Sequence, residues 1–134
     1  MTASLVYLDS SAIVKLVARE PESGPLFEWL GAWPDRISSA IARVEVFRAL
    51  GRSGAGGAVR RRAVDVLDRI ALMPIDRAVL DAAGEFGPPD LRSLDAIHLA
   101  TALSVGTELA GLVTYDARLA AAAARSRIGV WAPA

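Results

Sequence analysis

Short runs of apolar residues alternate along the chain with longer segments whose apolar residues recur at helical spacing. The short runs predict strands at residues 5–8, 37–39, 73–75, 111–114 and 128–131. The first predicted helix is capped by Ser10 or Ser11 and ends at Pro21, and further helices are predicted at 22–31, 40–53, 59–70, 76–86, 94–105 and 116–125. Strands that alternate with helices in this way predict an α/β fold with a mostly parallel sheet.

The length and composition are those of one small globular domain. With 134 residues, the chain is expected to form a single domain over residues 1–134. Its 15 acidic and 15 basic residues balance, so any polyanion must be bound locally rather than by an overall field. The absence of cysteine excludes disulfides and zinc–thiolate sites. No secretory signal or membrane-spanning run is found, so we expect a cytoplasmic protein with no membrane contact.

Acidic residues stand at positions where a solubilising charge is unusual. Asp9 and Asp116 follow predicted strands, and Asp95 lies in the first turn of an apolar helix. Glu45 interrupts a helix whose predicted apolar stripe comprises Ile41, Val44, Phe47 and Leu50. Parallel strands end at one edge of a sheet, and the helices packed on it begin near that edge. All these carboxylates are therefore expected to converge at the carboxyl edge, where ligands of open α/β sheets bind.

Carboxylates gathered in one crevice repel each other, by roughly 3 kcal/mol per pair at about 5 Å and an effective dielectric constant near ~20. Protons or cations must offset this repulsion. An all-oxygen ligand set favours Mg²⁺ or Mn²⁺ over zinc, as one or two ions. Such an ion binds a phosphate oxygen and lowers the pKa of an attacking water, which is the chemistry of phosphodiester hydrolysis. Ser11 and Thr114, beside the same edge, are expected to support the site with their hydroxyls.

Motifs around these acidic residues, at 6–12 (VYLDSSA), 43–46 (RVEV), 94–100 (LDAIHLA) and 113–116 (VTYD), occur in an order found in one protein family. With them the chain resembles the PIN-domain ribonucleases, specifically the VapC toxins of bacterial toxin–antitoxin pairs. The resemblance implies a five-stranded parallel sheet of order 3-2-1-4-5 with helices on both faces. It also implies a Mg²⁺- or Mn²⁺-dependent endoribonuclease, usually a homodimer, held inactive by a VapB-type antitoxin. The catalytic, metal-binding quartet carried over is Asp9, Glu45, Asp95 and Asp116, with Ser11 and Thr114 as supporting residues.

Several other side chains allow two interpretations each. His98, three residues after Asp95, is either a hydrogen-bonded core residue or a general base. The aromatic residues Phe27, Trp29 and Trp33 indicate either internal core or a partner surface. The candidates for contacts to RNA phosphates, chosen because they flank the acidic positions in sequence, are Arg43, Arg48, Arg92 and Arg118.

Two other functions compete with the nuclease. A phosphohydrolase with Asp9 as covalent nucleophile would need a second Asp two residues later, where this chain has Ser11, and an essential lysine, whereas Lys15 is the sole lysine. A non-catalytic PIN-like module that binds RNA or protein is expected to lack one or more of the acidic residues, all of which are present. The sequence therefore favours the nuclease.

Overall fold

A computed structural model, which describes residues 2–134, places a parallel sheet at the centre of the molecule. Its strands are β1 (Leu5–Leu8), β2 (Asp35–Ser39), β3 (Ala71–Met73), β4 (Leu109–Val113) and β5 (Val130–Trp131). Every neighbouring pair is parallel and the order is β3-β2-β1-β4-β5, which confirms the predicted topology. The helices are α1 (Ser10–Val17), α2 (Ser23–Leu30), α3 (Ala42–Arg52), α4 (Gly57–Asp68), α5 (Arg77–Glu85), α6 (Ser93–Val105) and α7 (Ala117–Arg125), with a 3₁₀ turn at Gly106–Glu108.

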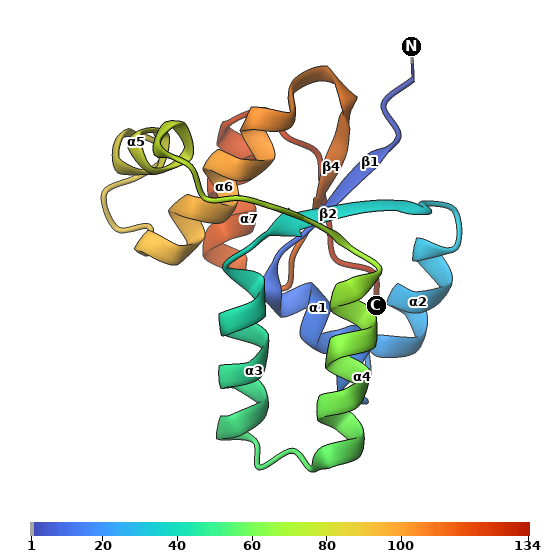
Figure 1. The fold of residues 1–134 in the computed structure, drawn as a ribbon. Helices are drawn as coiled ribbons and strands as arrows, with labels where there is room; N and C mark the ends of the chain where they lie inside the picture. Colours follow the sequence, from blue (N-terminus) through green and yellow to red (C-terminus); the bar gives the residue numbers. More distant parts are fainter. Residues whose placement is uncertain (1) are drawn as a thin grey trace.

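Helices cover both faces of the sheet, because successive side chains of a strand point to opposite faces. Val6 and Leu8 of β1 are buried in one cluster with residues of α1, α2, α3 and α4. Tyr7 points the other way, into a second cluster with residues of α6 and α7. The two groups of helices lie on opposite sides of the strands, with α3 and α4 side by side (Figure 1). No helix among residues 2–134 is long and apolar enough to cross a lipid bilayer.

Two local predictions were wrong for identifiable reasons. The third strand lies at Ala71–Met73 rather than at 73–75, in register with β2 from Ile37↔Ala71 to Ser39↔Met73. Pro74 has no backbone N–H to donate, so it ends the strand. The cap of α1 is Asp9, whose carboxylate accepts a hydrogen bond from the N–H of Ala12 at 3.0 Å, and not Ser10 or Ser11.

The buried face of α3 also differs from the predicted stripe. Ala42, Val46 and Leu50, spaced four residues apart, are buried, whereas Val44 is 54% exposed. Small Ala42 lets this face approach the layer of helices around α1. Glu45 therefore stands beside the buried face rather than within it, and its carboxylate stays partly accessible.

Stacked tryptophans fix the last strand against α2. The ring of Trp131 lies 5.3 Å from that of Trp29 and 5.9 Å from that of Trp33, centroid to centroid. Both tryptophans near α2 are thus part of the internal packing. Phe27 differs, since it is 74% exposed.

We predict that Gly111→Ala destabilises the fold. A Cβ at position 111 would overlap the ring of Trp131 and come within 2.7 Å of the Gly129 carbonyl oxygen, which cannot move aside. Overpacking of this kind costs about 1–3 kcal/mol, so urea unfolding should show a loss of at least that size. Gly84→Ala on α5, where an added Cβ meets nothing within 4 Å, is the matched control and should leave stability unchanged or raise it. Equal stability of the Gly111→Ala variant and the parent would contradict this packing.

Candidate active site

Asp9 lies at the centre of the acidic edge, buried to 3% exposure at the end of β1. Its Oδ1 accepts hydrogen bonds from Ser11 Oγ at 2.7 Å and from the N–H of Ala12 at 3.0 Å, and its Oδ2 accepts one from Thr114 Oγ1 at 2.6 Å. Burial raises the pKa of Asp9, and these donors act in the opposite direction. Oδ2 keeps a second lone pair, so it is free to bind one more electropositive group.

Ser11 and Thr114 tie the ends of β1 and β4 together. The register Leu8↔Val113 places Asp9 opposite Thr114. Ser11 Oγ accepts the N–H of Tyr115 at 2.9 Å, and Thr114 Oγ1 accepts the N–H of Asp116 at 3.0 Å. The two hydroxyls thus orient Asp9 and fix the turn that carries Asp116.

Asp116 caps α7 and also faces the site. Its Oδ1 accepts the N–H groups of Arg118 at 2.9 Å and Leu119 at 3.1 Å. Within residues 2–134, no protein donor hydrogen-bonds to its Oδ2. One carboxylate therefore serves both the helix and the site, one oxygen for each.

The pKa of Asp95, in the first turn of α6, is affected by the other carboxylates. Burial, followed by repulsion from Asp116, raises its pKa from 3.8 to about 6, and the charges of Asp9 and Glu45 add to this repulsion. The charges of the neighbouring carboxylates therefore disfavour the ionisation of Asp95.

Glu45 is held by hydrogen bonds at the opposite side of the site. Its Oε1 lies 2.7 Å from Ser10 Oγ, which donates to it, and 2.6 Å from His98 Nε2. Burial alone would raise the pKa of Glu45, but the hydrogen bonds from His98 and Ser10 outweigh it and the pKa lies below its ordinary value. His98 is 1% exposed and bonded at both ring nitrogens, as a hydrogen-bonded core residue should be.

These side chains border an open hollow of about 210 Å³. Its lining comprises Asp9, Ser10, Ser11, Val14, Glu45, Ala49, Arg52, His98 and Asp116. Asp95 is not part of this lining, but the charges of Asp116, Asp9 and Glu45 act on its pKa. The sequence did not lead us to predict Arg52 as a site residue, although it follows Glu45 by seven residues and so lies on the same face of α3.

The predicted arginines lie elsewhere. Arg43, Arg48 and Arg92 do not line the acidic hollow, and Arg43 lies 3.9 Å from Asp68. Arg118 borders a neighbouring hollow with Asp90 and Arg125. Their contacts to RNA stay predictions.

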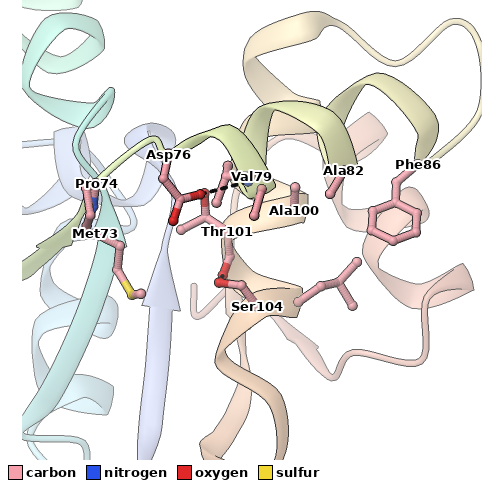
Figure 2. A pocket seen from close by; sticks show the side chains of 11 residues that line it. Met73, Pro74, Asp76, Val79, Ala82, Phe86, Ala100, Thr101 and Ser104 are labelled. Atoms are coloured by element: carbon pink, nitrogen blue, oxygen red, sulfur yellow. Dashed lines mark hydrogen bonds between the residues drawn. The ribbon is translucent and has the colours of Figure 1, made fainter.

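A larger hollow, of about 300 Å³, lies between α5 and α6 (Figure 2). Apolar side chains such as Val79 and Phe86 dominate its lining. Of the described residues that line it, only Asp76 is charged, and its Oδ1 caps α5 by accepting the N–H of Val79 at 2.9 Å. This hollow lacks the groups for hydrolysis, so the smaller acidic hollow is the candidate active site.

The donor chemistry of the site fits a hydrated divalent ion. Among residues 2–134, no three acidic or histidine side chains are close enough together to enclose a metal ion. Mg²⁺ needs no such cage, because it typically binds one or two carboxylates and keeps several waters. A cation could bind Oδ2 of Asp116 and the remaining lone pair on Oδ2 of Asp9, which also accepts from Thr114. Its charge would offset the repulsion that helps to raise the pKa of Asp95.

Comparisons with known proteins agree with this geometry. A family model described as "PIN domain" matches residues 6–125. Ribonuclease VapC46 of Mycobacterium tuberculosis is 48% identical over 128 residues, which cover 96% of this chain and 97% of the relative. Ribonuclease VapC47 of the same species is 42% identical over 119 residues, covering 86% and 87% of the two chains.

Solved structures share the fold. The crystal structure of M. tuberculosis VapC20, described as a sarcin–ricin loop cleaving toxin, superposes with a TM-score of 0.70 at 18% identity, over 87% of this chain and 94% of the other. A chain of a toxin–antitoxin complex from Klebsiella pneumoniae gives 0.62 at 22% identity, over 83% and 86%. The family match, the identity to the VapC ribonucleases and the shared topology together establish that this chain belongs to the PIN-domain family.

Proposed function

We propose that the protein is a Mg²⁺- or Mn²⁺-dependent endoribonuclease and the toxin of a type II toxin–antitoxin pair. The observation that carries the proposal is the hollow lined by Asp9, Glu45 and Asp116, beside which burial and the charges of these carboxylates raise the pKa of Asp95 to about 6. High identity to proteins named Ribonuclease VapC supports RNA as the substrate class.

In this proposal each carboxylate has a defined task. Asp9, Glu45, Asp95 and Asp116 would share one or two divalent ions, each ion taking one or two of these carboxylates. Glu45 would also orient water in the hollow or accept its proton. A bound ion supplies charge to a phosphate oxygen and lowers the pKa of water. Ser11 and Thr114 orient Asp9 and favour its ionised form against the effect of burial, since both donate to its carboxylate.

The same geometry disfavours covalent attack by Asp9. A nucleophilic carboxylate needs an accessible oxygen in line with phosphorus, whereas Asp9 is 3% exposed and both of its oxygens accept hydrogen bonds. Attack by water is therefore the better mechanism for this site.

The family relationship also suggests partners. We infer a VapB-type antitoxin and a homodimer, as expected for VapC-like proteins. Large exposed apolar side chains support protein partners, with Phe27 74%, Leu80 51% and Phe86 48% exposed.

We predict that Asp116→Asn abolishes RNA cleavage without unfolding the protein. Asn caps helices as well as Asp does, so the N-terminus of α7 keeps its acceptor while the site loses a charge. Loss of one electrostatic group in a reacting site lowers the rate by about 10²–10³-fold. The assay follows cleavage of transfer, ribosomal and messenger RNA with Mn²⁺ or Mg²⁺, and with EDTA as the metal-free reference.

Asp76→Asn is the matched control for this variant. Asp76 caps α5 in the same manner as Asp116 caps α7, but it lies in the apolar hollow. The Asp76→Asn variant should therefore cleave RNA at the parental rate. A fully active Asp116→Asn variant would refute the assignment of the site.

Arg52 is predicted to bind the RNA backbone. It is the basic residue in the lining of the acidic hollow. In the inactive Asp116→Asn background, Arg52→Ala should weaken RNA binding and lower the slope of log Kd against log salt by about 0.7, the value for one phosphate contact on a single strand. Fluorescence anisotropy of labelled RNA at several salt concentrations measures both the Kd and this slope.

Arg77→Ala is the control for Arg52, because Arg77 is 94% exposed on α5 and lies 3.8 Å from Asp81. An unchanged slope for Arg52→Ala would remove Arg52 from the interface. The same assay on Arg43, Arg48, Arg92 and Arg118 tests the positions predicted from the sequence.

We also predict a pH dependence of stability in the metal-free protein. The folded state raises the pKa of Asp95 from 3.8 to about 6, so it binds this proton more tightly than the unfolded state does. The resulting stabilisation is complete below about pH 4 and is lost as the pH rises through about 6. Thermal unfolding in EDTA should show Asp95→Asn gaining stability relative to the parent across this range. Parallel curves for the two proteins would contradict the clustering of charge around Asp95.

A further inference from the structure

His98 is bonded at both ring nitrogens by residues of other elements. Its Nδ1 lies 2.7 Å from the hydroxyl of Tyr7 on β1, and its Nε2 lies 2.6 Å from Oε1 of Glu45 on α3. The rings of Tyr7 and His98 meet edge to face, with centroids 5.7 Å apart. Both residues are essentially inaccessible to solvent, so the chain Tyr7–His98–Glu45 runs from the core to the hollow.

The direction of these hydrogen bonds follows from their partners. An ionised carboxylate only accepts hydrogen bonds, so Nε2 must carry the hydrogen that Glu45 receives. In neutral imidazole Nδ1 is then an acceptor, and the Tyr7 hydroxyl donates to it. A tyrosine hydroxyl has one hydrogen to donate, and Nδ1 lies 2.7 Å from it.

The network leaves one oxygen of Glu45 for the site. Ser10 and His98 both approach Oε1, and no protein donor among residues 2–134 hydrogen-bonds to Oε2. The side chain of Glu45 is 21% exposed, whereas that of His98 is 1% exposed. The fixed end of the carboxylate therefore faces the protein, and the free end is available to the hollow.

We propose that Tyr7 and His98 are a positioning pair for Glu45. Tyr7 holds His98 in the form that carries hydrogen on Nε2, and His98 holds Glu45 with Oε2 available to the hollow. Hydrogen-bond partners of this kind orient the residues of a site without touching the substrate. The effect on RNA cleavage rests on the proposed nuclease activity and the effect on metal binding rests on the proposed metal site, whereas the hydrogen positions rest on neither.

The hydrogen positions can be measured directly. His98 is the sole histidine of the sequence, so protein without a histidine tag gives one set of ring-nitrogen signals. Long-range ¹H–¹⁵N spectra of the wild type should show the form with hydrogen on Nε2. Hydrogen on Nδ1, or on both nitrogens, would overturn the proposal, whether or not any variant folds.

Tyr7→Phe then tests the positioning role. It removes the hydroxyl that fixes His98, so the ¹⁵N spectrum should show a mixture of the two neutral forms. Binding of Mn²⁺ should weaken by about tenfold, because Glu45 loses its fixed position, and kcat at saturating Mn²⁺ should also fall about tenfold. KM for RNA should change less than about twofold, because the side chain that is altered, Tyr7, is fully buried.

Tyr115→Phe is the matched control, since Tyr115 is the second of two tyrosines and its hydroxyl donates to the carbonyl of Pro133 at 2.6 Å. It should keep the parental spectrum, Mn²⁺ affinity and kcat. If Tyr7→Phe behaves like Tyr115→Phe, the positioning role is wrong although the nuclease stands. If no RNA is cut by the wild type, but Tyr7→Phe alters the spectrum and weakens Mn²⁺ binding, the proposed function fails and the positioning role stands.

Discussion

The structure depends on holding a carboxyl group, that of Asp9, at the almost fully buried end of its central strand. Removing such a group from water is unfavourable, and the fold offsets this with donors from Ser11, Ala12 and Thr114. The same donors join β1 to β4 and begin α1. The need to hydrogen-bond the buried carboxyl group of Asp9 therefore organises this edge of the sheet. The remaining carboxylates gather around this fixed point, and their repulsion appears in the raised pKa of Asp95.

Structural and chemical roles coincide in the aspartates of this site. Asp9 and Asp116 each cap a helix with Oδ1 and keep a lone pair of Oδ2 unused by the protein. A helix cap fixes the rotamer of the carboxylate, which places the second oxygen at little additional entropic expense. The cap and the functional interpretation of these residues are therefore compatible. Asp76 is a helix cap that belongs to no acidic cluster, because none of the other described residues that line its hollow has a carboxylate.

The topology could be predicted because strong local patterns agree with simple rules of parallel sheets. Asp9 and Asp116 follow strands that end at one edge, and this already places them together. The third strand shifted because Pro74 limits pairing, and the predicted stripe on α3 failed because Val44 is apolar yet exposed. Periodicity counts apolar residues but does not say which neighbours cover them.

The side-chain contacts that arrange the site could not be predicted from the sequence alone. The link from Tyr7 to His98 spans 91 residues, and that from His98 to Glu45 spans 53, so no sequence window contains either pair. Arg52 was within reach of the sequence through its spacing from Glu45, but proximity along the chain favoured Arg43 and Arg48 instead. Of these arginines, Arg52 lines the acidic hollow and Arg43 and Arg48 do not.

The central claim is that these carboxylates form a binding site for a hard divalent cation. Anomalous diffraction from a crystal soaked in Mn²⁺ tests it most directly, because the ion locates itself without reference to activity. We expect an anomalous peak within bonding distance of carboxylate oxygens of Asp95 and Asp116, beside Asp9. A peak elsewhere on the molecule, with none at this edge of the sheet, would contradict the account.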